Sequence, residues 1–287
     1  MNILTTEKRA QIISILVEGG GINAACSITG VSKNAVLRLL AHLGSACAAY
    51  QDRVMRDLKI KRLECDETWL FVAMKQRNVP EQLKGIFGFG DVYIWTAICA
   101  DSKLIPCWHA GTRTAESAYD FINDLATRLS NRVQLTTDEH KAYIDAIEDA
   151  SGNDIDYAQL VKIYGNQGQS KDEARRYLPA ECTGINKQRL IGNPNMRKVS
   201  TSYVERANLT MRMNLRRFTR LTNAFSRKLK NHMHAISLIF MVHNFCKIHS
   251  TLGISPAQSA GVDDHVWDIE EIIVMADTQD VTSRDSM

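Results

Sequence analysis

The sequence has 287 residues, of which 45% are hydrophobic and 23% charged, which is enough for one large hydrophobic core and a smaller appended domain. No stretch approaches the roughly 18 apolar residues of a membrane-spanning helix, and the N-terminus MNILTTEKRAQ is polar, unlike a signal peptide, so we expect a cytoplasmic protein. The seven cysteines are scattered and contain no Cys-x-x-Cys pair, so neither a disulfide framework nor a zinc ribbon is indicated.

The positive charge is concentrated in one part of the chain. Between Lys187 and Lys230 there are twelve Lys or Arg residues and a single acid, Glu205, which gives this segment a net charge of +11 and leaves −8 for the remainder. A solvated helix face is the ordinary explanation of a charge run, but such faces normally carry interspersed acids. The segment therefore favours a polyanionic partner, because neutralised phosphates release counterions.

The N-terminal residues predict a DNA-reading unit. Apolar spacing indicates three short helices between residues 6 and 43, with a Gly-Gly-Gly stop at 19–21 and Ser32 as the N-cap of the third helix. This is a helix-turn-helix pattern, although similar three-helix units also serve as protein-binding caps. The residues that the third helix would present to a DNA major groove are Lys33, Asn34 and Arg38.

The remainder of the chain alternates strands and helices. Runs rich in β-branched and aromatic residues predict strands at 63–73, 91–100, 103–111, 132–139 and 156–164. Helical spacing predicts helices at 115–130, 141–150, 202–217 and 226–249. Residues 164–200 are predicted as a loop or insertion, and the last twenty or so as frayed. We therefore expect a helix-turn-helix domain at 1–45, a helical linker at 46–62, an α/β domain at 63–255 and a C-terminal tail at 256–287.

Three acids occupy positions where a carboxylate is costly unless it has a function. Asp66 interrupts an apolar strand, Asp138 ends another strand, and Glu205 opens a basic helix. A buried carboxylate needs a cation or hydrogen-bond donors, and oxygen ligands suit hard cations such as Mg²⁺. Phosphodiester cleavage uses such clusters to hold two ions about 4 Å apart. If the two strands are neighbours and the helix packs across them, Asp66, Asp138 and Glu205 form a catalytic metal site.

Arginines on and after the same helix are candidate contacts to phosphate. Arg212 lies seven residues after Glu205, two turns along one helix face, where it can meet a phosphate beside the acids. The other candidates for contact with the DNA backbone are Arg216, Arg217 and Arg220.

Three segments resemble the DDE transposases of the insertion sequence one family. They are Cys65-Asp66-Glu67-Thr68-Trp69, Thr136-Thr137-Asp138 with Lys141-Ala142-Tyr143, and SYVERANLTMRMNLRRFTRLTNAFSRKLKNHMHAISLIFMVHNFCKIHSTL. The likeness runs from about Leu63 to Leu252, and it is most specific around Glu205. The chain departs from the family in having no Cys-x-x-Cys zinc finger before the helix-turn-helix, and in a longer loop between Asp138 and Glu205.

The resemblance implies a fold, a cofactor and a substrate. The fold is ribonuclease H-like, a mixed five-stranded sheet with flanking helices, preceded by the small helix-turn-helix domain. Asp66, Asp138 and Glu205 are the implied ligands of two Mg²⁺ ions, for which Mn²⁺ can substitute. The implied partners are double-stranded terminal-repeat and target DNA, bound by a homodimer or larger assembly associated with the nucleoid.

We therefore expect a transposase that cleaves the ends of its element and joins the freed 3′-hydroxyl to target DNA without a covalent protein intermediate. Two alternatives remain open at the level of sequence. One is a nuclease of the same fold without strand transfer. The other is a domesticated DNA-binding regulator that uses residues 1–45 alone; the presence of all three acids favours an enzyme.

Overall fold

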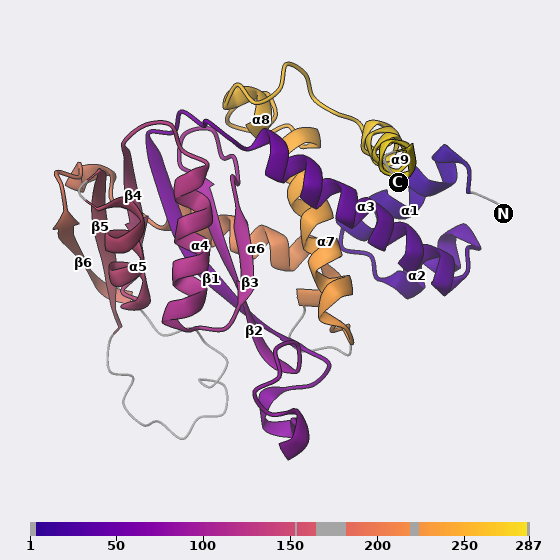
Figure 1. The fold of residues 1–287 in the computed structure, drawn as a ribbon, viewed down its shortest axis with the longest axis horizontal. Helices are drawn as coiled ribbons and strands as arrows, with labels where there is room; N and C mark the ends of the chain where they lie inside the picture. The colour runs from indigo at the N-terminus through magenta and orange to yellow at the C-terminus, as the bar shows by residue number, and fades with distance from the viewer. Residues whose placement is uncertain (1–3, 153, 165–181, 219–223, 286–287) are drawn as a thin grey trace.

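The computed structural model describes residues 4–152, 154–164, 182–218 and 224–285. Its centre is a mixed sheet of six strands in the order β3-β2-β1-β4-β5-β6 (Figure 1). The strands are β1 (Arg62–Val72), β2 (Gly90–Cys99), β3 (Trp108–Gly111), β4 (Val133–Thr137), β5 (Ile155–Tyr164) and β6 (Cys182–Ile191). The pairs β1–β4 and β4–β5 are parallel, and the other neighbours are antiparallel. The prediction of an α/β fold with a mixed sheet is confirmed.

The sixth strand corrects the prediction of a five-stranded sheet. Residues 182–191 were expected to be part of a loop, yet they pair with β5 along its length. Most of the β6 side chains are exposed, because β6 is the edge strand. Backbone hydrogen bonds stabilise such a strand with little burial of side chains, so its sequence carries no apolar alternation to reveal it.

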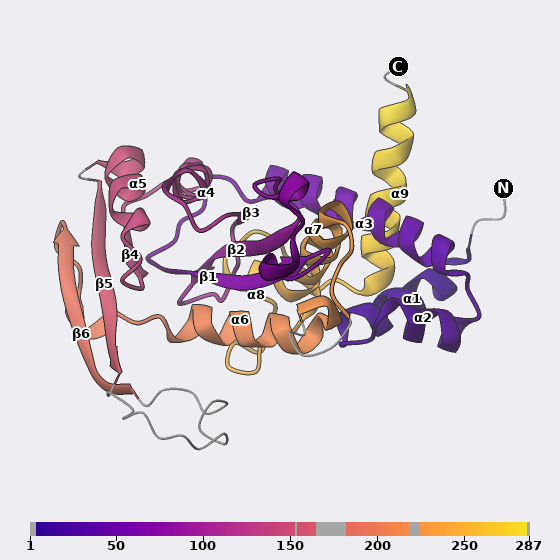
Figure 2. The same cartoon turned by 90° about the horizontal axis from the view of Figure 1, so that it is seen from below.

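Helices cover both faces of the sheet. Helices α4 (Ala115–Thr127) and α5 (Ala142–Ser151) pack on one face, and α6 (Ser202–Asn214) runs across the other (Figures 1 and 2). On the first face the buried ring of Trp95 contacts Phe121 of α4 and Tyr143 of α5, with ring centroids 6.1 and 5.2 Å apart. Because both faces are covered, strand β2 is buried over most of its length.

The N-terminal helices lie beyond one edge of the sheet (Figure 2). They are α1 (Thr6–Val17), α2 (Ile22–Thr29) and α3 (Lys33–Val54), and the side chain of Ser32 caps α3 as expected. Helix α3 continues through the expected boundary at residue 45, so residues 46–54 belong to the same helix as Lys33. Side chains from these helices and from the sheet form one continuous hydrophobic core.

Helix α3 is held against α7 (Leu229–Met241), which continues as a π-helical turn, Val242–Cys246. The two helices approach closely at Gly44, where an added Cβ would lie 2.5 Å from the backbone oxygen of His234. Short 3₁₀ turns lie at Gln76–Asn78, Glu81–Leu83, Met196–Lys198 and Arg216–Phe218.

The C-terminal segment is helical, which corrects the expectation of a frayed end. It contains α8 (Pro256–Ser259) and α9 (Ile269–Asp285), and α9 contacts both α1 and α3. Three side chains of α9 are fully or almost fully buried, namely Ile272, Ile273 and Ala276. Asp277 of α9 accepts two hydrogen bonds of 2.9 Å from Arg9 of α1. Tertiary packing therefore orders a segment whose position near the chain end had suggested fraying.

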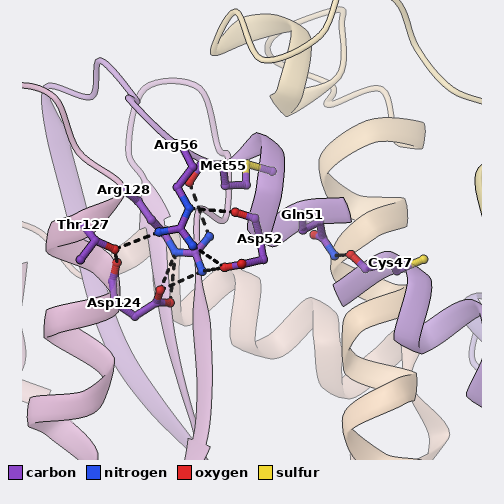
Figure 3. A network of polar contacts seen from close by, with 8 residues as sticks. All are labelled: Cys47, Gln51, Asp52, Met55, Arg56, Asp124, Thr127 and Arg128. Carbon is purple, nitrogen blue, oxygen red and sulfur yellow. Dashed lines mark hydrogen bonds and ion pairs between the residues drawn. The ribbon is translucent and has the colours of Figure 1, made fainter. Parts of the chain in front are cut away.

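A network of charged residues joins the end of α3 to the end of α4 (Figure 3). Arg128, whose side chain is 8% exposed, donates hydrogen bonds to both carboxylate oxygens of Asp124 at 3.0 Å and to Asp52 at 2.7 Å. Arg56 bonds the same Asp52 at 2.6 Å and Thr127 at 3.0 Å. The network fixes the long N-terminal helix relative to the sheet.

In the parts of the chain that the structure describes, no helix is both long and apolar enough to cross a membrane.

Candidate metal centre

Strand β1 carries acids on both of its faces, because successive side chains of a strand alternate. Glu64 and Asp66 face α6, whereas Glu67 faces α5. Strand β4 runs parallel to β1 with Thr136 paired to Glu64. Two residues further along both strands, Asp66 lies beside Asp138. The parallel pairing of β1 and β4, which β2, β3 and α4 separate in the sequence, therefore brings two predicted acids together.

The compact acidic cluster is Asp66, Glu67 and Asp138. One carboxylate oxygen of each residue lies within 4.8 Å of the others, which is close enough for a shared metal ion. The Asp138 carboxylate also accepts a hydrogen bond of 3.0 Å from the backbone N–H of His140, which fixes its orientation at the end of β4.

Glu205 lies in the same cavity but outside this compact cluster. A cavity of ≈ 690 Å³ is lined by Asp66, Asp138 and Glu205 together with Arg212, and we call it the acid cavity. The Glu205 carboxylate forms an ion pair with Lys162 of β5 and accepts a hydrogen bond of 2.6 Å from Thr201. The structure thus brings all three predicted acids and Arg212 to one cavity, with Glu205 paired to a lysine.

Helix α6 is anchored to β1 by two polar contacts. Thr201, the N-cap residue, makes no side-chain capping bond. Instead the buried Glu64 accepts hydrogen bonds from the backbone N–H groups of Tyr203 and Val204, at 2.7 and 3.1 Å. One turn beyond Glu205, the Asn208 amide donates to Asp66 at 2.8 Å. A carboxylate at a helix N-terminus also meets the positive end of the helix dipole. Both contacts fix the part of α6 that carries Glu205.

The electrostatics of the cluster favour a bound cation. Burial, followed by the like charges of Glu67 and Asp138, raises the pKa of Asp66 to about 7. Burial and Asp138 likewise raise the pKa of Glu67, although its hydrogen bond from Arg113, 2.7 Å long, opposes the shift. The buried carbonyl oxygen of Asn208 has no hydrogen-bond partner within the described residues. Closely spaced hard oxygen donors with too little positive charge around them fit a divalent metal ion.

The sequence did not predict four residues at or near the site: Lys162 and Asn208, which line the acid cavity, and Glu67 and Arg113, which lie beside Asp138. Glu67 adjoins Asp66 but points to the opposite face of β1, so strand alternation argued against a shared site. The spacing of three residues between Glu205 and Asn208 places both on one helix face and was an available signal. Nothing in the local sequence connects Arg113 or Lys162 to the acids, since only the fold brings them together.

The predicted DNA contacts fall into separate groups. Arg212 lines the acid cavity, and Lys33, Arg216 and Arg217 line a second cavity. Arg217 is half-buried and donates a hydrogen bond of 3.0 Å to Ser226, so it also has a structural contact. Asn34 and Arg38 are exposed on α3 and belong to neither lining. Arg220 lies outside the described residues.

Comparison with known proteins gives no further assignment. A scan against models of protein families found no match, and a search of curated proteins found none either.

Proposed function

We propose that the chain is a DNA transposase, which cleaves phosphodiester bonds at the ends of its element and joins the freed 3′-hydroxyl to target DNA. One observation carries the proposal: Asp66, Asp138 and Glu205 meet in one cavity, where the parallel pairing of β1 and β4 ends and under a cationic helix. The strand order of the sheet and the resemblance of its segments to the insertion sequence one family support the same conclusion.

In this proposal the cavity residues have distinct roles. Asp66, Asp138 and Glu205 hold two Mg²⁺ ions, and Glu67 adds negative charge beside the first two. The bound ions supply activation of the attacking oxygen and stabilisation of the leaving oxygen. Asn208 fixes the Asp66 carboxylate, and Arg212 binds a phosphate next to the acids. Lys162, which neutralises Glu205 in this structure, adds a further positive charge for the DNA backbone.

The test uses the whole chain and duplex DNA copied from both flanks of its own gene. With Mg²⁺, the chain should nick this DNA at the ends of the element and join the ends to a second duplex. Replacement of each acid by its amide, namely Asp66→Asn, Asp138→Asn and Glu205→Gln, should lower both reactions by at least about a thousandfold while the chain remains folded. Cleavage without joining would identify a nuclease, and DNA binding without either reaction would identify a regulator.

A second variant tests whether Asp66 itself contacts the metal. Asp66→Cys replaces a hard carboxylate with a thiolate, which binds Mn²⁺ better than Mg²⁺. Its activity should be absent in Mg²⁺ and return in part in Mn²⁺. Asp66→Ala is the matched control and should stay inactive with both ions. Equal activity of Asp66→Cys in the two metals would remove Asp66 from the proposed ligands.

A further inference from the structure

A second cavity, of ≈ 840 Å³, separates the N-terminal helices from the segment that follows α6. Its walls come from the turn between α1 and α2, the start of α3, the residues after α6 and the start of α7. Five of its lining residues are cations: Lys33, Arg216, Arg217, Arg227 and Lys228. No Asp or Glu occurs among the described lining residues. We call this site the basic cavity.

The first turn of α2 forms part of the same wall. Gly21 is its N-cap residue and makes no side-chain capping bond. The first N–H groups of a helix have no partner within the helix, and they carry the positive end of its dipole. A Cβ added at Gly21 would lie 3.7 Å from Cγ of Arg216, so the side chain of Arg216 lies close to this turn. The N-terminal end of α2 and the guanidinium group of Arg216 therefore both add positive potential to this part of the cavity.

The packing of the fold alone does not explain why so many cations line the basic cavity. Arg217 has a hydrogen bond to Ser226, but Lys33 and Arg216 are exposed on opposite walls of the cavity. Like charges held close together repel each other unless an opposite charge lies between them. The lining of the cavity also includes apolar side chains, among them Leu37, Leu215 and Phe225. A polyanion with apolar groups between its charges satisfies both parts of the lining, and a nucleic acid strand has this pattern.

Helix α6 connects the two cavities. It carries Glu205 and Arg212 into the acid cavity and leads directly to Leu215 and Arg216 of the basic cavity. From Glu205 to Asn214 the helix rises about 14 Å at 1.5 Å per residue. Along one DNA strand, phosphates are spaced about 3.4 Å apart on the helix axis. A strand that follows α6 from the acids therefore reaches the basic cavity after about four to six nucleotides.

We propose that the basic cavity binds the phosphate backbone of the DNA strand whose reacting phosphate lies in the acid cavity. The inference rests on the proposed function and adds a second site to it. The N-terminal helices and the segment after α6 then hold the DNA jointly, with Lys33 on one side of the backbone and Arg216 on the other.

The first test measures binding of the whole chain to a duplex of arbitrary sequence in EDTA, where metal-dependent cleavage does not occur. The double variant Lys33→Gln/Arg216→Gln should bind more weakly, and the slope of log K against log salt should become shallower by about two. The matched control is Arg53→Gln/Lys59→Gln, which removes two exposed charges outside the cavity and should leave the slope unchanged. The thermal melting temperature of each variant shows that it is folded.

The outcomes separate this inference from the proposed function. If the wild-type chain binds DNA and the double variant keeps its full salt dependence, the basic cavity is not a DNA site and the proposed function is unaffected. An equal loss in the control pair would also overturn the inference, because the effect would then come from net charge. A wild-type chain with no salt-dependent binding would overturn both proposals.

The second test locates the contact on the DNA. Single neutral methylphosphonates are placed at two to eight nucleotides from the phosphate that the chain cleaves. Wild-type binding should be weakest when the replaced phosphate lies four to six nucleotides away, and the same replacement should have no further effect on the double variant. Sensitivity confined to other positions, or undiminished in the double variant, contradicts the inference.

Discussion

Two charged clusters of this protein lie on the same sheet framework but differ in their charge balance. In the Arg128 network, two arginines meet two aspartates, and each guanidinium has a carboxylate partner within 2.6–3.0 Å. In the acidic cluster of Asp66, Glu67 and Asp138, Arg113 contacts Glu67 and Asp138 at 2.7 and 4.0 Å, and Asp66 has no ion pair among the described residues. The charges of the first cluster balance one another, whereas the second has an excess of negative charge and could hold a cation.

This difference separates a cluster that stabilises the fold from one that could hold a cation. A balanced network stabilises the fold, and removal of one partner leaves an unpaired charge. An unbalanced cluster destabilises the ligand-free fold, so removal of one of its charges relieves repulsion. The same kind of substitution should therefore have opposite effects on stability at the two places.

The largest effect on stability is expected in the balanced cluster. Arg128→Met keeps the apolar part of the side chain but leaves Asp124 and Asp52 without their common partner. We expect the free energy of unfolding to fall by about 3 kcal/mol, measured by urea denaturation. Arg132→Met is the control, because Arg132 lies on the surface, where solvent screens its ion pair with Asp156, and its replacement should change stability much less. A stable Arg128→Met variant would show that the network does not hold α3 to α4.

Addition of divalent metal should have an effect of nearly the same size in the acidic cluster. A ligand present at a hundredfold excess over its Kd stabilises the folded state by about 2.7 kcal/mol. Mg²⁺ should therefore raise the melting temperature of the wild-type chain but not that of Asp66→Asn or Asp138→Asn. The Arg128→Met variant serves as the control and should keep the full response. An identical shift in all four proteins would show that the ion binds elsewhere.

A smaller effect concerns pH. The raised pKa of Asp66, about 7 compared with 3.8, means that the folded state binds a proton more tightly than the unfolded state. Without metal, protonation of Asp66 stabilises the folded state. This contribution to the free energy of unfolding is present in full below about pH 4 and is lost as the pH rises towards 7. Asp66→Asn should remove this decline, which we expect to be about 2 kcal/mol after solvent screening. Parallel stability profiles of the two proteins between pH 5 and 8 would contradict the assignment.

The smallest effect is expected at Glu64. Glu64→Gln retains an oxygen that accepts hydrogen bonds from the first turn of α6, whereas Glu64→Leu removes it. We expect Glu64→Leu to lose about 1 kcal/mol of stability, as for a lost helix cap, and Glu64→Gln to lose less. Because α6 carries Glu205, the cleavage rate should fall in Glu64→Leu and recover in Glu64→Gln. Equal cleavage rates in both variants would mean that α6 needs no anchor on β1.

The sequence predicted the elements that bury apolar side chains. Strands β1, β2, β4 and β5 and helices α4 to α7 were found close to their bounds, because alternation and helical spacing record which face is buried. Strand β6 was missed because it is held mainly by backbone pairing. Helix α9 was missed because the buried stripe in its described part, Ile272, Ile273 and Ala276, is short; its contacts with α1 and α3 hold it in place.

The candidate site was predictable only in part. Asp66 and Asp138 could be predicted because a carboxylate in or beside an apolar strand is costly unless it has a cation or hydrogen-bond donors as partners. The proximity of Glu67 to Asp66 and Asp138 could not be predicted, because the side chain of Glu67 points to the other face of β1. The pairing of Lys162 with Glu205 depends on the position of β5 relative to α6, a long-range feature that no local pattern records.

The contact between α9 and α1 has a consequence for how the protein is made. About 250 residues separate the end of α1 at Val17 from the start of α9 at Ile269. At roughly 5–20 residues per second, a ribosome takes on the order of 10–50 s to cover this length. During translation the N-terminal helices therefore emerge long before the helix that covers them. Their packing against α9, including the hydrogen bonds from Arg9 to Asp277, can form only after α9 has been synthesised.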